Sequence, residues 1–224
     1  MKYTIHRAAI VPPLDGNWNS PHWQKAETLE VARFYDRSSD HRPKTEARVL
    51  YDSKGVYVFF RVQDRYVRAV AAQYQDSVCT DSCVEFFVQP KTGKGYFNFE
   101  VNCGGVVLLY FVEDAAGGAG DRKNRTHVPK ELFETMRVYH SMPARVPEEI
   151  AEPTVWTVAY FVPFSLFEAY VGPVGDVAGQ TWRANFYKCA DKTSHPHWAS
   201  WVDIGPILSF HQPAFFAPIE FARD

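Results

Sequence analysis

Two short segments carry acidic and amide side chains in a spacing that could bind a hydroxyl-rich molecule. Residues 83–89 and 96–102 each alternate apolar and polar positions, which is typical of strands buried on one side. Paired strands must turn their apolar faces toward one core, and a strand's side chains alternate between its faces. Glu85, Glu100 and Asn102 are therefore expected on the same face, where carboxylates and amides can accept from and donate to hydroxyl groups.

The same row of polar residues also fits a sheet face that is merely wetted by solvent. Antiparallel sheets commonly pack one face against a core and leave the other in water. The alternation alone leaves both interpretations open, so the elements around the two segments must decide between them.

The rest of the chain predicts an all-β fold with few helices. Asp52 to Gly55 marks a hairpin turn, and Pro163 begins a short helix that extends to Phe167. Residues 64–78 and 142–153 are expected to be connections, 113–124 a mobile glycine-rich loop, and 190–206 a long loop. The expected strands are 5–11, 26–31, 45–51, 55–62, 83–89, 96–102, 106–112, 132–140, 154–162, 182–189 and 215–221. This pattern predicts one domain over residues 1–224, an antiparallel β-sandwich of jelly-roll type with long loops and one or two short helices.

Composition excludes several classes of protein. A hydrophobic content of 46% argues against disorder, and a net charge of −2 without a basic stripe argues against nucleic-acid binding. No apolar run reaches the roughly 18 residues of a membrane span. The N-terminus lacks an apolar signal core, so the chain is expected to be cytoplasmic, or extracellular or periplasmic if a leader was trimmed. Aromatic residues reach 16%, which suits both a β-rich fold and a surface that stacks on ligands.

The four cysteines are too few and too scattered for a disulfide scaffold. Cys83 and Cys103 come near each other on paired strands, but the alternation points them to opposite faces. No bond between them is expected.

The order of several motifs resembles a known family. These motifs are Asp15-Gly16 with Trp23, Leu50-Tyr51-Asp52, Asp81 to Phe87, Tyr96 to Asn102, Trp182 to Lys188, a tryptophan-bearing loop and a closing Phe-Phe strand. Together they resemble the carbohydrate-binding module family 9-like domains, within the DOMON-like β-sandwich group, and the resemblance covers nearly the whole chain.

The resemblance implies a sugar-binding sandwich with structural calcium, in which a glycan end sits between two tryptophans beside a Glu and an Arg. It assigns Glu85 as the hydroxyl-binding carboxylate and Trp198 or Trp201 as one stacking wall. This chain has no tryptophan shortly before Asp81, and Glu100 stands where an Arg is expected. The calcium ligands are not identifiable from the sequence, and acidic loop residues such as Asp15 or Asp64 are candidates.

We therefore expect non-catalytic binding of a carbohydrate, in the context of polysaccharide degradation and beside glycoside hydrolases. Flat aromatic faces would cover the C–H patches of a pyranose and polar groups would bind its hydroxyls. The expected ligand-binding residues are Glu85, Glu100, Asn102, Asn185, Lys188, Trp198 and Trp201.

Three alternatives remain open from the sequence. Glu85 and Glu100 could form the carboxylate pair of a glycoside hydrolase. His195 and His197, with Cys189, Asp191 and His211, could bind a transition metal, although the spacing matches no strong motif. Haem binding would be the third alternative, but no Met-His pairing supports it.

Overall fold

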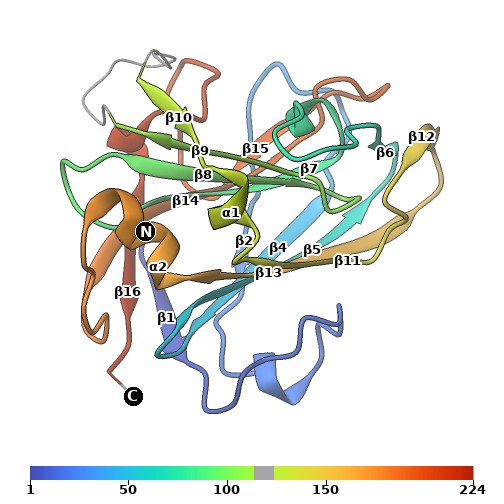
Figure 1. The fold of residues 1–224 in the computed structure, drawn as a ribbon. Coiled ribbons are helices and arrows are strands. Elements are labelled where there is room, and N and C mark those ends of the chain that lie inside the picture. Colours follow the sequence, from blue (N-terminus) through green and yellow to red (C-terminus); the bar gives the residue numbers. More distant parts are fainter. Residues whose placement is uncertain (114–123, 224) are drawn as a thin grey trace.

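The computed structural model describes residues 1–113 and 124–223, and it folds as a β-sandwich of two curled layers (Figure 1). The expected all-β fold is confirmed. The expected loop at 113–124 falls almost wholly outside the described residues. Within the described residues, no helix is long and apolar enough to cross a membrane.

One layer carries the two polar segments at its centre. Its strands, in spatial order, are β10 (Arg125–His127), β9 (Val107–Val112), β8 (Tyr96–Asn102), β7 (Cys83–Gln89), β14 (Thr181–Cys189) and β16 (Ala217–Phe221). Two short strands, β15 (Trp198–Ser200) and β3 (Arg33–Phe34), extend it beside β14.

The second layer closes the other side of the core. Its strands are β4 (Lys44–Tyr51), β5 (Gly55–Asp64), β13 (Thr154–Pro163) and β11 (Arg137–His140), with β2 (Leu29–Glu30) beside β4. The expected hairpin between β4 and β5 is present, and the Asp52 carboxylate accepts from the backbone N–H groups of Lys54 and Gly55.

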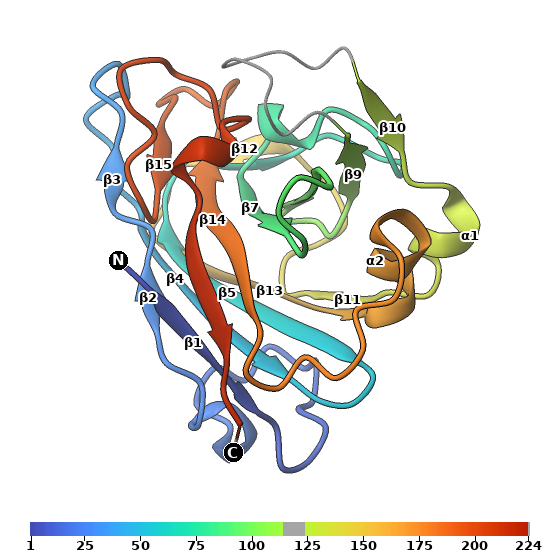
Figure 2. The same cartoon turned by 90° about the vertical axis from the view of Figure 1, so that its left-hand side faces the viewer.

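Strand β1 (Tyr3–Arg7) joins the two layers. Tyr3 to Ile5 pair in parallel with β16, and His6 and Arg7 pair in parallel with β4. Figure 2 shows these three strands side by side. The expectation of an edge strand at 5–11 is therefore wrong. The strand begins at Tyr3, ends at Arg7 and has a partner on each side. The sequence of a single strand does not reveal which strands pair with it.

Two segments expected to be plain connections pair with each other. They are β6 (Val67–Ala69) and β12 (Val146–Ile150), which form a separate two-stranded sheet. The remaining elements are α1 (Lys130–Phe133), α2 (Phe164–Val171) and 3-10 turns at Pro21–Trp23, Val78–Thr80 and Pro213–Phe215.

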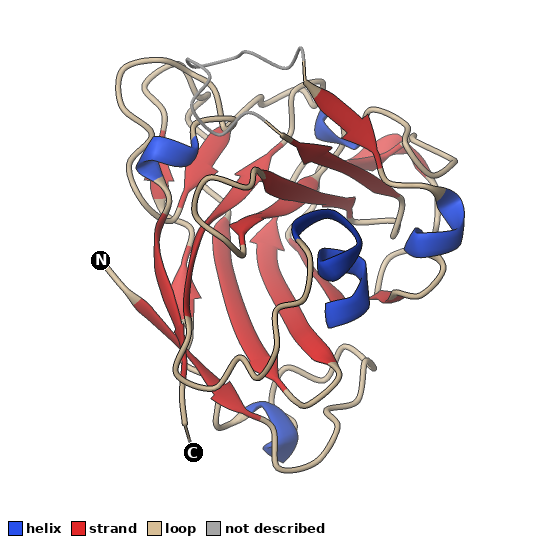
Figure 3. Ribbon diagram, turned by 60° about the vertical axis from the view of Figure 1, so that its left-hand side comes forward, coloured by secondary structure: helices blue, strands red, loops and turns tan. Residues whose placement is uncertain are grey.

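Helix α2 begins directly after Pro163, as expected, and lies at one open end of the sandwich (Figure 3). Phe167 of α2 contacts the rings of Phe97, Phe99 and Trp182 at 5.3–5.8 Å between centroids. The helix thereby seals apolar side chains that the two layers alone would leave exposed.

The core between the layers follows the strand alternation. Phe86 of β7 and Phe99 of β8 point into it together, as the sequence predicts. The opposite face of β7 and β8 is also buried, because residues 190–216 fold across it and form a second apolar cluster that includes Phe87, Tyr187 and Phe216. The polar face of β7 and β8 is therefore covered by protein and is not simply exposed to solvent.

Candidate functional site

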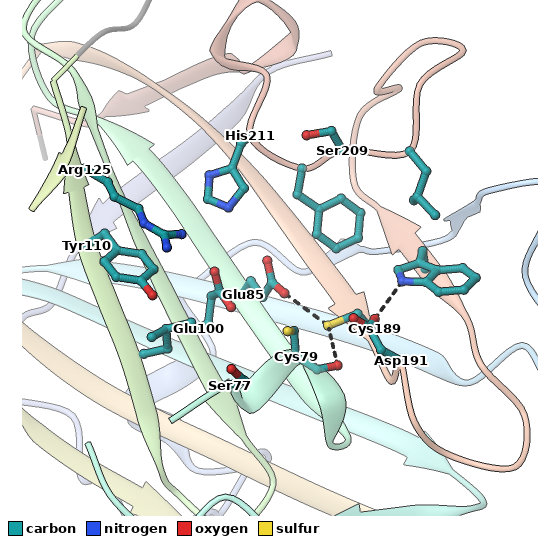
Figure 4. Close-up of a pocket in the computed structure, with 14 residues that line it drawn as sticks. Ser77, Cys79, Glu85, Glu100, Tyr110, Arg125, Cys189, Asp191, Ser209 and His211 are labelled. Carbon is teal, nitrogen blue, oxygen red and sulfur yellow. Dashed lines mark hydrogen bonds between the residues drawn. The ribbon is translucent and has the colours of Figure 1, made fainter. Parts of the chain in front are cut away.

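A cavity of about 390 Å³ opens on this covered face of the first layer (Figure 4). Strands β7, β8, β9, β10, β14 and β15 and the loop before β16 contribute to it. Its lining residues are Ser77, Cys79, Glu85, Glu100, Leu108, Tyr110, Arg125, Cys189, Asp191, Trp198, Leu208, Ser209, Phe210 and His211.

Two carboxyl groups form the floor of the cavity. Glu85 and Glu100 are directly opposite each other in the register of β7 and β8, which confirms that they share a face. They are only 2% and 5% exposed. The Asn98 amide donates to Glu100 Oε1 at 2.7 Å, and the Cys189 thiol donates to Glu85 Oε1 at 3.1 Å. These contacts hold both carboxyl groups in place and leave the cavity above them for a ligand.

Two aromatic side chains stand on the walls of the cavity. Trp198 lies opposite Cys189 in the pairing of β15 with β14, and its indole N–H donates to Asp191 Oδ1 at 2.8 Å. Tyr110 comes from β9, and the Arg125 guanidinium lies 4.7 Å from the centre of its ring. Figure 4 shows Tyr110 and Arg125 on one side of the carboxyl groups and Asp191 on the other.

The loop before β16 covers the upper part of the cavity. His211 Nδ1 lies 2.8 Å from the Tyr96 hydroxyl, and the ring of Phe210 stacks on Tyr187 at 4.1 Å between centroids. The amide of Gln212 donates to the carbonyl oxygens of Ile204, Ile207 and Ser209 at 2.7–3.2 Å. Gln212 therefore ties the loop together internally, while His211 and Phe210 hold it against β8 and β14.

The cavity is rich in acidic and neutral groups. Glu85, Glu100 and Asp191 face a single guanidinium, that of Arg125, among its described lining residues. Burial raises the pKa of the Cys79 thiol well above its usual range, and the hydrogen bond with the neighbouring Cys83 thiol, together with burial, does the same for Cys189. Both thiols are therefore protonated near neutral pH, when they can act as weak donors.

Three of the expected ligand-binding residues border the cavity, namely Glu85, Glu100 and Trp198. Asn102 and Asn185 lie on the same face, but their amides hydrogen-bond to neighbouring protein groups rather than bordering the cavity. Asn102 donates to Asp81 Oδ2 and accepts from the N–H of Val106, and Asn185 bonds to the backbone of Val202 through both ends of its amide.

Lys188 lies on the opposite face from the cavity. Its place in the alternation of β14 is that of Ala184 and Phe186, so its ammonium group is buried between the layers. There it lies 3.5 Å from Asp64 Oδ2 and donates to His197 Nε2 at 2.7 Å. Lys188, named among the expected ligand-binding residues, therefore does not border the cavity.

Trp201 also lies away from the cavity. It is 5% exposed and packs edge-on against Tyr3 and Phe186 in the main core. Trp198 and Trp201 are three residues apart at the short strand β15, so they leave the chain on opposite sides.

The histidines considered as transition-metal ligands lie in separate parts of the structure. His211 borders the cavity with Cys189 and Asp191, whereas His195 stacks on Tyr66 at 3.7 Å between ring centroids. His197 accepts from Lys188, and burial together with that ammonium group lowers the pKa of His197 to about 3. The structure does not bring this set together as ligands of one ion.

The two acidic residues considered for calcium lie in different surroundings. Burial alone would raise the pKa of Asp64, but Lys188, His41 and Trp156 together hold it well below its usual range. Its oxygens accept from His41 and from Trp156, so positive and donor groups already surround the carboxylate. Asp15 is exposed and accepts from the N–H of Asn17 within a turn.

Several lining residues were not assigned to the binding face by the sequence analysis. Tyr110 could have been found by extending the alternation to a third strand, because it lies opposite Asn98 in the pairing of β9 with β8. Arg125, Ser209 and Phe210 carry no local signal, since only the folding of their loops brings them to the cavity.

Comparison with known proteins identifies a related family. Residues 22–221 match the family described as Carbohydrate-binding family 9. No curated protein sequence matches the chain.

Solved structures share the fold over the whole chain. One is a Bacteroides uniformis protein, itself assigned only provisionally to carbohydrate binding, with 28% identity and a TM-score of 0.81 over 98% of both chains. Two others are family 9 carbohydrate-binding modules from Caldicellulosiruptor kristjanssonii, each 12% identical. The cellotriose complex has a TM-score of 0.62 over 100% of this chain and 95% of that one, and the glucose complex 0.59 over 99% and 97%.

Proposed function

The chain belongs to carbohydrate-binding family 9, and from that premise we propose that it binds a carbohydrate, without cleaving it, in the cavity above Glu85 and Glu100. The observation that carries this proposal is the pairing of two carboxyl groups on the floor with an indole on the wall. A pyranose offers hydroxyls to the first and a C–H face to the second.

The size and enclosure of the cavity support the proposal. Its volume of about 390 Å³ falls within the range of small-molecule sites, roughly 300–1,000 Å³. A molecule of one or a few sugar rings suits it better than a long polymer laid on a flat surface. Glucose and cello-oligosaccharides are the first ligands to test, since related modules have been solved with glucose and with cellotriose.

The seven residues named from the sequence take different parts in this proposal. Glu85, Glu100 and Trp198 contact the sugar, because they border the cavity. Asn102 and Asn185 keep strand ends and loops in position through backbone hydrogen bonds, and Lys188 and Trp201 stabilise the core. Arg125, Tyr110 and His211 join the contact set.

We also propose that this binding serves polysaccharide degradation, beside glycoside hydrolases. A domain that holds a glycan raises the local concentration of substrate for any enzyme near it. The alternative in which Glu85 and Glu100 cleave a glycosidic bond has no specific support from the geometry or the comparisons.

Calorimetric titration with glucose, cellobiose and cellotriose tests the proposal. Glu100→Gln and Trp198→Ala should each weaken binding about tenfold or more, because charged hydrogen bonds and stacking typically exceed 1 kcal/mol. Glu134→Gln and Phe215→Ala, on exposed residues outside the cavity, are the matched controls.

Equal affinity in Glu100→Gln, Trp198→Ala and the wild type would overturn this site. An aryl-glycoside assay run on the same samples tests cleavage. Turnover that disappears in Glu85→Gln would replace the binding proposal with the hydrolase alternative.

A further inference from the structure

A compact set of metal-binding side chains lies beneath the cavity. Cys83 of β7 and Cys189 of β14 are directly opposite each other in the strand register and point to the same face. Glu85 follows two residues after Cys83 on that face. One ligand atom from each of these three residues lies within 4.8 Å of the other two.

We propose that Cys83, Cys189 and Glu85 form a site for a thiophilic divalent cation such as Zn²⁺. None of the comparisons assigns this site, and it does not depend on the proposed sugar binding. The two sulfur ligands select against Ca²⁺ and Mg²⁺, which prefer oxygen, and in favour of Zn²⁺ or Cd²⁺.

The ligand atoms lie close enough together for one ion to reach all three. Zn–S bonds of 2.3 Å and Zn–O bonds of about 2.1 Å in a tetrahedron place ligand atoms about 3.5–3.8 Å apart. Cys189 Sγ already lies 3.1 Å from Glu85 Oε1, where a hydrogen bond now joins them. A cation at this position would replace the thiol proton as the link between sulfur and carboxylate.

The strands make the set rigid. All three residues are at most 2% exposed, and they lie on two strands at the centre of the first layer. The backbone carbonyl of Cys79 lies 3.7 Å from Cys189 Sγ and orients this thiol from outside the set. A site held by a sheet keeps its geometry better than one held by loops.

An ion can reach the site through the cavity. Cys189 and Glu85 border it, whereas Cys83 lies deeper. The fourth ligand position therefore faces the cavity, where a water molecule can complete a tetrahedron, as in zinc sites with three protein ligands.

The charge of the surroundings favours a cation. Two thiolates and one carboxylate would carry three negative charges, with Glu100 directly opposite Glu85 on the neighbouring strand. A divalent ion offsets two of these charges, and its binding releases the thiol protons.

Titration of the reduced, metal-free protein with Cd²⁺ tests the proposal, because cadmium thiolates absorb in the ultraviolet. The wild type should develop this band with saturation at one equivalent. Cys83→Ser combined with Cys189→Ser should abolish it, and Glu85→Gln should weaken binding about tenfold. Cys103→Ser is the matched control, since Cys103 is equally buried but lies in the main core on the other face.

A second measurement keeps the proposal testable if the double variant fails to fold. In the wild type, one equivalent of Zn²⁺ should protect Cys189 and Cys83 from a thiol reagent, as mapped by mass spectrometry, and leave the rate at Cys103 unchanged. The proposal is overturned if the wild type gives no band at stoichiometric Cd²⁺, if the band persists in the double variant, or if Zn²⁺ protects no cysteine. Sugar titrations repeated with a chelator keep this result separate from the proposed function.

Discussion

At the scale of single residues, the most unusual feature is a buried charged cluster between the layers. Lys188 and Asp64 form an ion pair with no exposure to solvent, and His197 and His41 add contacts to it. The N–H of His197 Nδ1 donates to the carbonyl of His195, so its Nε2 is free to accept from Lys188. This arrangement requires a neutral His197.

The cluster should make the fold sensitive to acid. The pKa of His197 is about 3 when folded, below its ordinary value near 6.5, so the unfolded chain takes up the proton first. Stability from this group is present above about pH 6.5 and is lost as the pH falls toward 3. The lowered pKa of Asp64 adds a further loss below about pH 4.

Lowering the pH from 7 to 5 should reduce the free energy of unfolding by up to about 2 kcal/mol, because the unfolded chain protonates His197 and the folded one does not. Urea unfolding at both pH values measures this difference. His197→Gln keeps an acceptor for Lys188 but does not titrate, so its stability should change less over the same interval. If His197→Gln keeps the pH dependence of the wild type, His197 is not the group responsible. His22→Gln, at an exposed histidine, is the control.

At the scale of elements, the site depends on a loop laid over a sheet. The central strands β7, β8 and β14 supply the floor, and the segment between β15 and β16 supplies the cover. Gln212 is the main internal tie of that segment, since its buried amide bonds to three carbonyl oxygens.

Gln212→Ala should loosen the cover more than the sheet. Three carbonyl oxygens would lose their donor, at a cost of about 1–3 kcal/mol. Hydrogen exchange should rise over residues 203–216 and stay unchanged in β7 and β8, while the affinity for the sugar falls. Gln24→Ala, on an exposed residue, is the control. Equal exchange over 203–216 in the variant and the wild type would show that the loop is held by other contacts.

At the scale of the whole molecule, the first strand joins the two layers into one curled sheet. Ile5 is fully buried in the core where β1 passes from β16 toward β4. A change there acts on both layers together.

Ile5→Ala should destabilise the protein by about 2–5 kcal/mol, the usual range for a large apolar side chain removed from a core. Denaturant unfolding measures the loss, and a single transition is expected because both layers share the strand. Ile10→Ala, at 67% exposure, should change stability by less than about 0.5 kcal/mol. A loss of similar size in both variants would contradict the joining role of β1.

The sequence by itself determined which residues share a face. The period of two in a strand is a local property, so it correctly placed Glu85 on the same face as Glu100 and put Phe86 and Phe99 in the core. The same local reasoning correctly gave the hairpin at Asp52 and the helix that follows Pro163.

Only the tertiary structure decided what covers that face and what reaches the cavity. Lys188 meets Asp64, 124 positions earlier in the chain, and Arg125 reaches the cavity from a strand at the edge of the sheet. Trp198 lines the cavity while Trp201 packs inside, because a short strand forms where a loop was expected. These outcomes depend on contacts between segments far apart in sequence, and such contacts leave no periodic signal in either segment alone.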